Sequence, residues 1–159
     1  AKPVAIVCNK AGAVVLAIAE KHGIPVEMID KTRFSSEEFL NKINTYNPDL
    51  LVLAGFLWKV PSNLVAQYPN KIINIHPALL PKYGGKGMYG MNVHNTVIEQ
   101  KEKESGITIH YVNEHYDEGN VIVQAHCTIS ETDTPELLAH NIHKLEHFYF
   151  PRTIEFLLK

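Results

Sequence analysis

The sequence predicts an α/β protein with a doubly wound, mostly parallel sheet, an antiparallel hairpin at one edge and a long C-terminal helix. First, short apolar runs rich in Val, Ile and Leu alternate with helical patterns in the first half of the chain. Second, two later runs of strand type flank a turn at residues 117–120, which is typical of a hairpin. Third, Thr134 and Pro135 form a helix start followed by a long helical pattern.

The expected parallel strands are short and apolar, as strands buried on both faces should be. They cover residues 4–8, 26–29, 50–54 and 72–75. Between them we expect three helices. The first covers residues 13–21 and is closed by Gly23 and Pro25. The second runs from the residue after Ser35 to Tyr46, with Glu38 placed for a capping box, and the third covers residues 62–67.

The second half of the chain begins with a loop at residues 82–90 that contains four glycines in seven residues. Glycines permit close backbone approach or movement, so this loop is predicted to be a lid or a binding loop. A helix is expected at 91–103, and strands are expected at 107–112 and 121–129. A final helix is expected from Thr134 to Tyr149, and the pattern leaves open whether it continues past Pro151.

Length and composition are those of a single domain, residues 1–159, with a core of its own. Hydrophobic residues make up 45% and the formal net charge is −2, which gives no basic field for nucleic acid or an anionic membrane. No apolar run approaches the roughly 20 residues of a membrane helix, and the start lacks the form of a signal peptide, so a cytoplasmic location is expected. Cys8 and Cys127 show no CxxC spacing and are expected to be reduced core residues.

The chemistry is concentrated where the strand at 72–75 ends. Asn74 and His76 are two residues apart, so their side chains should share one face of the sheet while Ile73 and Ile75 take the other. Pro77 ends the strand. Ligands of open α/β sheets bind beyond the carboxyl ends of the strands, so this pair is predicted to form part of a site.

Three motifs together resemble the folate-dependent formyltransferases, over nearly the whole chain and in order. They are Leu53-Ala-Gly-Phe, Asn74-Ile-His-Pro-Ala-Leu-Leu-Pro-Lys-Tyr and Asp117-Glu-Gly. The resemblance implies the formyltransferase fold, and it implies that Asn74, His76 and Asp117 are the catalytic trio.

Elementary chemistry supports those roles. Transfer of a formyl group to an amine passes through a tetrahedral oxyanion, which the Asn74 amide and a protonated His76 could stabilise by hydrogen bonds. A carboxylate at Asp117 should raise the pKa of His76, and a histidine poised near neutral pH can shuttle the proton from the amine to the leaving nitrogen.

The resemblance also implies the binding residues. The folate pocket is expected to be lined by Phe56, Leu57, Trp58, Lys59 and Val60 on one wall and by Val112, Asn113, Glu114, His115 and Tyr116 on the other, with Asn74 and Asp117. Glu146 matches a position that contacts the sugar of a ribonucleotide substrate, and His110 is expected near the site. The nine histidines show no HExxH or Cys/His pattern, so no metal is expected.

The chain departs from the family at two places. Residues 1–10 align with the family's second strand, so the sequence shows neither the family's first strand nor its phosphate-binding turn. The first βα unit is therefore expected to be missing from the domain. Loop 84–90 also differs, because relatives usually carry a histidine-containing segment there.

The resemblance implies transfer of a formyl group from 10-formyltetrahydrofolate to the amine of glycinamide ribonucleotide in purine biosynthesis, with no covalent enzyme intermediate. Three alternatives stay open at this point. They are hydrolysis of formyltetrahydrofolate by a deformylase, formyl transfer to another amine, and a folate- or nucleotide-binding module without catalysis.

Overall fold

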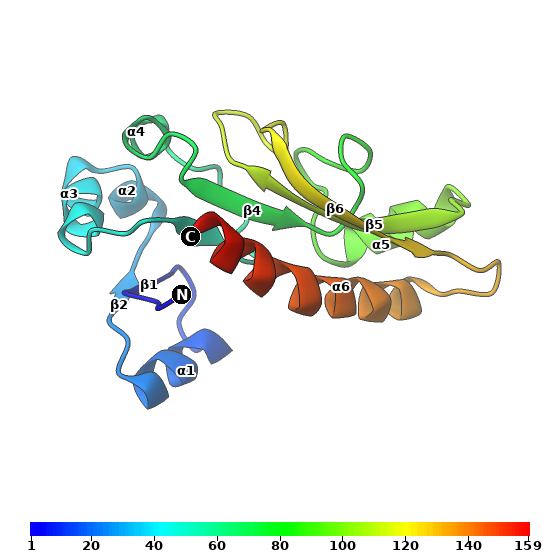
Figure 1. Ribbon diagram of the computed structural model, residues 1–159, viewed down its shortest axis with the longest axis horizontal. Coiled ribbons are helices and arrows are strands. Elements are labelled where there is room, and N and C mark those ends of the chain that lie inside the picture. Colours follow the sequence, from blue (N-terminus) through cyan, green and yellow to red (C-terminus); the bar gives the residue numbers. More distant parts are fainter.

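The computed structural model describes all 159 residues. Its strands are β1 (Ile6–Cys8), β2 (Val26–Met28), β3 (Leu51–Leu53), β4 (Ile72–His76), β5 (Glu104–Tyr111) and β6 (Val121–Thr128). Its helices are α1 (Val14–His22), α2 (Lys31–Phe34), α3 (Glu37–Thr45), α4 (Ser62–Gln67), α5 (Met91–Glu99) and α6 (Pro135–Leu157). The predicted α/β class, the hairpin edge and the long final helix are confirmed (Figure 1).

The strands form two sheets. Strands β1 and β2 pair in parallel, and a second sheet has the order β3-β4-β5-β6. In this second sheet β3 and β4 are parallel, while β5 runs antiparallel to both β4 and β6. Strand β6 therefore runs in the direction of β3 and β4, so three of the four strands of this mixed sheet share one direction.

Strand β4 is the centre of the fold because its two faces meet different cores. Ile73 is fully buried with α5 and α6 residues such as Val93 and Leu138. Ile72, one residue earlier, packs instead with Phe39 of α3 and residues of α4. This alternation confirms that Ile73 and Ile75 lie on one face, which leaves the other face of β4 for Asn74 and His76.

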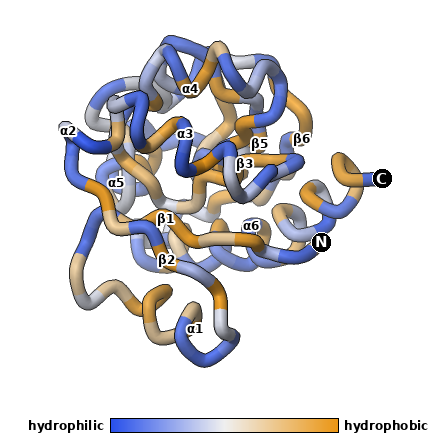
Figure 2. The backbone as a smooth tube through the Cα atoms, turned by 90° about the vertical axis from the view of Figure 1, so that its left-hand side faces the viewer, coloured by the Kyte–Doolittle hydropathy of each residue, from blue (hydrophilic) through white to orange (hydrophobic).

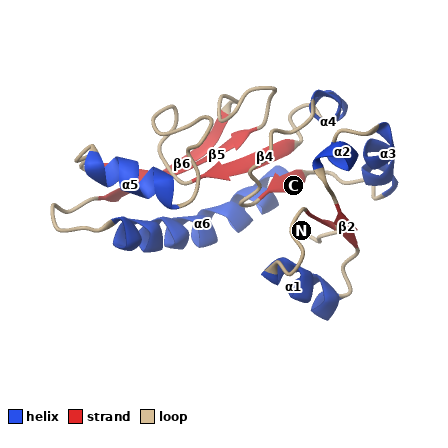
Figure 3. Ribbon diagram, turned by 180° about the vertical axis from the view of Figure 1, so that it is seen from behind, coloured by secondary structure: helices blue, strands red, loops and turns tan.

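Helix α6 runs along the β5–β6 hairpin for most of the molecule's length (Figures 1 and 3). It begins as predicted: the Thr134 hydroxyl accepts a hydrogen bond from the Leu137 amide at 3.2 Å, and Pro135 occupies the first turn. The helix continues through Pro151 to Leu157, so one element places residues far apart in sequence beside the sheet.

Two local predictions need correction. The cap of α3 is Ser36 and not Ser35, because the Ser36 hydroxyl accepts from the Phe39 amide at 3.1 Å. Residues 31–34 form a short helix, α2, that the sequence pattern did not predict; the Asp30 carboxylate caps it by accepting from the Arg33 amide at 2.7 Å.

The segment β1–α1–β2 lies at one end of the molecule, away from β5 and β6 (Figures 1 and 3). Helix α1 stands apart from the main body in Figure 2. Its apolar side chains include Val14 and Ile18, which are exposed. No helix of the structure is both long enough and apolar enough to span a membrane.

Candidate active site

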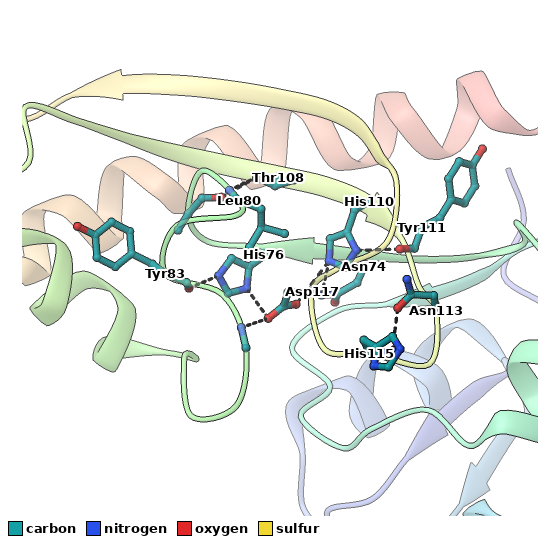
Figure 4. Close-up of polar contacts among 12 residues, drawn as sticks. Asn74, His76, Leu80, Tyr83, Thr108, His110, Tyr111, Asn113, His115 and Asp117 are labelled. Carbon is teal, nitrogen blue, oxygen red and sulfur yellow. Dashed lines mark hydrogen bonds and ion pairs between the residues drawn. The ribbon is translucent and has the colours of Figure 1, made fainter.

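The carboxyl end of β4 delivers Asn74 and His76 to one wall of a cleft (Figure 4). His76 is almost fully buried, with 3% of its surface exposed. On the neighbouring strand β5, His110 is the register partner of Asn74. The turn between β5 and β6 carries Asp117 back to the same point, so the predicted trio converges.

The ring nitrogens of His76 have different partners. Nε2 lies 2.7 Å from the backbone carbonyl oxygen of Tyr83. A carbonyl can only accept, so Nε2 carries a hydrogen and donates it. Nδ1 faces the Asp117 carboxylate, 3.6 Å from Oδ2. Nδ1 is therefore the nitrogen through which a proton can enter or leave.

Burial is the largest influence on His76 and lowers the pKa of its imidazole below the ordinary value. The Asp117 carboxylate and the Tyr83 carbonyl both raise this pKa, while His110 lowers it further. Asp117 thus acts in the predicted direction, but the net shift is downward. Burial thus favours the neutral form of the His76 imidazole, and the carboxylate beside it would stabilise the protonated form.

Asp117 is kept ionised in spite of its burial. Burial raises the pKa of its carboxyl group, but the nearby His110 imidazole, a hydrogen bond from the Gly85 amide and the His76 imidazole hold that pKa below its usual range. The Gly85 amide donates to Oδ2 at 2.9 Å, and His110 Nε2 lies 3.5 Å from Oδ1. The turn is tight: a Cβ at Gly119 would lie 1.7 Å from the Tyr111 carbonyl oxygen.

His110 sets the orientation of the Asn74 amide. Its Nδ1 lies 2.9 Å from the Tyr111 carbonyl oxygen, so Nδ1 carries a hydrogen and Nε2 of the neutral ring is an acceptor. The Asn74 Nδ2 lies 3.3 Å from that Nε2 and donates to it. An amide nitrogen has two hydrogens, so the second one is available to another acceptor in the cleft.

The cleft has a volume of about 1140 Å³ and lies against both the trio and the predicted binding segments. Every residue that the sequence analysis assigned to folate or ribonucleotide binding lines it, in the segments 56–60 and 112–117 and at Glu146. Glu146 lies on α6, and burial raises the pKa of its carboxyl group. The structure thus brings all predicted residues to one cavity, and their binding roles stay predictions.

The chain matches the formyl transferase family model over residues 1–154. The chain belongs to the formyl transferase family. Its relatives include the chloroplastic phosphoribosylglycinamide formyltransferase of Arabidopsis thaliana, 41% identical over 150 residues, which are 91% of this chain and 51% of the relative. The phosphoribosylglycinamide formyltransferase of Bacillus subtilis (strain 168) is 35% identical over 96% of this chain and 78% of its own length.

Solved structures of the formyl transferase family agree with this fold. The phosphoribosylglycinamide formyltransferase of Coxiella burnetii superposes with a TM-score of 0.84 at 37% identity, covering 94% of this chain and 71% of the other. The enzyme of the same name from Bacillus halodurans gives a TM-score of 0.85 at 34% identity, covering 98% and 80%. The chain spans about half the length of the plant relatives that it matches.

This formyl transferase chain also has cleft residues that the sequence analysis missed. Phe34 of α2 lines the cleft and forms an aromatic cluster with Phe56 and Trp58, with ring centroids 5.1 and 6.1 Å from its own. Nothing in the local pattern distinguished Phe34 from a core residue. By contrast, His143 and His147 lie three residues before and one after Glu146, and helical spacing could have placed His143 beside it.

His94 of α5 was also missed as a cleft residue. It is 3% exposed, and its Nδ1 is the one buried side-chain nitrogen or oxygen without a hydrogen-bond partner. Burial, followed by His143 and His76, lowers the pKa of its imidazole. No group of three or more His, Cys, Asp or Glu side chains is arranged to hold a metal ion.

Proposed function

We propose that this chain transfers a formyl group from 10-formyltetrahydrofolate to the amine of glycinamide ribonucleotide. The observation that supports the proposal most is the convergence of Asn74, His76 and Asp117 on a cleft that also holds the predicted binding segments. The names of the relatives from Arabidopsis thaliana and Bacillus subtilis support the choice of substrates.

The reaction begins with attack of the amine nitrogen on the formyl carbon. The carbonyl double bond opens to an oxyanion, which accepts the second hydrogen of the Asn74 amide. One such donor contributes about 3–4 kcal/mol to the transition state in a site that excludes water. The orientation of this amide depends on His110, whose Nε2 takes the other hydrogen.

The proton released by the amine passes to His76. Nε2 already carries a hydrogen for Tyr83, so Nδ1 accepts the proton, and the imidazolium forms beside the Asp117 carboxylate. His76 then returns the proton to the folate nitrogen as its bond to carbon breaks. The products are the formylated amide and tetrahydrofolate, and no metal or redox group takes part in this sequence.

The binding roles extend the proposal. The segments 56–60 and 112–117 would hold the folate, with its ring system against the aromatic cluster of Phe34, Phe56 and Trp58. Glu146 would accept hydrogen bonds from sugar hydroxyls of the ribonucleotide. A partly desolvated carboxylate suits this task, because each hydroxyl restores a hydrogen bond that burial has removed.

The test is to incubate the full-length protein with 10-formyltetrahydrofolate, with and without glycinamide ribonucleotide, and to follow tetrahydrofolate by absorbance. Release that requires the amine, with a formylated product in the mass spectrum, supports the proposal. Equal release in water alone would instead indicate a hydrolase, and no release in either case would leave a binding module.

A further inference from the structure

The loop after β4 contacts His76 and Asp117, the two ionisable members of the trio, through two successive peptide groups. The Tyr83 carbonyl accepts the hydrogen of His76 Nε2 at 2.7 Å, and the Gly85 amide donates to Asp117 Oδ2 at 2.9 Å. Gly84 between them passes so close that an added Cβ would lie 3.3 Å from the Asp117 Cβ. The position of this loop therefore determines how His76 and Asp117 face each other.

The loop needs to be held, because Tyr83 has a backbone φ of 57°. This left-handed region is uncommon for residues with a large side chain and persists where surrounding contacts enforce it. Earlier in the loop the Leu80 amide donates to Thr108 Oγ1 at 3.0 Å, and Gln124 donates to the Leu80 carbonyl at 2.9 Å. These bonds fix the start of the loop on β5 and β6, but they do not fix Tyr83 itself.

Glu102 supplies the missing contact. It lies between α5 and β5, and its Oε1 accepts a hydrogen bond of 2.7 Å from the Tyr83 hydroxyl. The same oxygen accepts from Lys82 Nζ at 2.9 Å. The Tyr83 ring also packs against the larger hydrophobic cluster. The Glu102 carboxylate thus holds the side chains of Lys82 and Tyr83, and the backbone carbonyl of Tyr83 is the group that contacts His76.

We propose that Tyr83 and Glu102 are positioning residues, which keep the hydrogen of His76 on Nε2 by holding the Tyr83 carbonyl in place. This proposal rests on the proposed role of His76 as the proton carrier. If the carbonyl moved away, the hydrogen of neutral His76 would shift to Nδ1, where the Asp117 carboxylate would accept it. Nδ1 would then have no lone pair for the proton of the attacking amine, and the reaction would slow.

Other ionisable groups also lie near His76, and they must be considered when the effect of a Tyr83 variant on His76 is interpreted. Asp117 and His110 act on it electrostatically from the turn and from β5, and His94 of α5 is also close enough to be influenced by it. All three side chains are still present when the Tyr83 hydroxyl is removed. A change in His76 in that variant therefore reports a movement of the loop, which contacts His76 through Tyr83 and Asp117 through Gly85, and not the loss of a charged neighbour.

The experiment is NMR of the full-length protein with ¹⁵N-labelled histidine, because ring ¹⁵N shifts report which nitrogen carries the hydrogen. Tyr83→Phe and Glu102→Ala should both move the His76 hydrogen from Nε2 toward Nδ1. They should lower the pKa of His76, since the Tyr83 carbonyl raises it. They should also lower kcat about tenfold, as expected for the loss of one hydrogen bond, with KM nearly unchanged.

Two further variants separate positioning from general stability. Glu102→Gln keeps an oxygen acceptor for the Tyr83 hydroxyl, so it should restore the wild-type His76 spectrum. Tyr68→Phe removes a comparable hydroxyl, which donates to Asn44 at 2.7 Å in the other hydrophobic cluster, and should leave the His76 spectrum unchanged. The double variant of Tyr83→Phe and Glu102→Ala should be no worse than either single one.

Unaltered His76 ring shifts and an unaltered pH profile in Tyr83→Phe would overturn the positioning role. This readout does not depend on activity. If the wild-type protein transferred no formyl group while the ring shifts changed as expected, the proposed function would fail and the positioning role would stand.

Discussion

Replacing Asn74 with alanine tests the proposed chemistry most directly, because this side chain has one structural bond and one proposed catalytic bond. The structural bond joins Nδ2 to His110 Nε2 at 3.3 Å, at a half-buried position. Its loss should cost about 0.5–1.5 kcal/mol of folding free energy. His110 keeps its bond to the Tyr111 carbonyl, so the strand pairing should survive.

The catalytic bond should cost more than the structural one. Removal of one oxyanion donor costs about 2.7–4 kcal/mol in the transition state, which corresponds to a fall in kcat of about 100- to 1000-fold. Because the donor acts on charge that develops only during the reaction, KM for both substrates should change little.

The assay compares kcat, KM and the denaturation midpoint of wild type, Asn74→Ala and Asn74→Asp. The aspartate variant keeps the shape but has no amide hydrogens, so it should be at least as inactive as the alanine variant. A fall in kcat of less than about tenfold in a folded Asn74→Ala protein would refute the donor role. A loss of activity that followed only from unfolding would refute it as well.

Three further predictions concern His76, His94 and the turn. Asp117→Asn should lower the pKa of His76 measured by NMR, because the carboxylate raises it, and equal values in both proteins would remove Asp117 from its role. For His94, burial lowers the folded-state pKa below 6.5, so the unfolded chain binds more protons and stability falls as the pH drops through that value. His94→Leu should therefore lose less stability than wild type between about pH 7 and pH 5 in urea titrations, and parallel losses would contradict this. Gly119→Ala should lower both the melting temperature and kcat, since its Cβ would lie 1.7 Å from the Tyr111 carbonyl oxygen; a variant with wild-type values of both would show that the turn is not constrained there.

Much of the fold followed from local patterns. The short apolar runs rich in Val, Ile and Leu predicted strands β1 to β4, and the Thr134–Pro135 start predicted α6. The predictions that failed concern single helical turns. Helix α2, which is capped by Asp30 alone, was not predicted, and the cap of α3 lies one residue later than expected. Such one-turn elements carry too few residues to show a period.

The sequence by itself determined which groups could do the chemistry. An amide and an imidazole two residues apart on a buried strand must share a face, and the family motifs point to the acid in the later turn. The shared face depends only on spacing along the chain, and the assignment of Asp117 depends on the resemblance of its motif to the family, so neither needed coordinates.

Tertiary structure alone decided how those groups are protonated and aimed. The tautomer of His76 depends on the Tyr83 carbonyl, and the direction of the Asn74 amide depends on His110 of another strand. The net lowering of the His76 pKa is a balance between burial and Asp117, which the residue types could not settle. Hydrogen positions and pKa values respond to distances of a few ångströms between residues far apart in sequence, and only the folded arrangement fixes those distances.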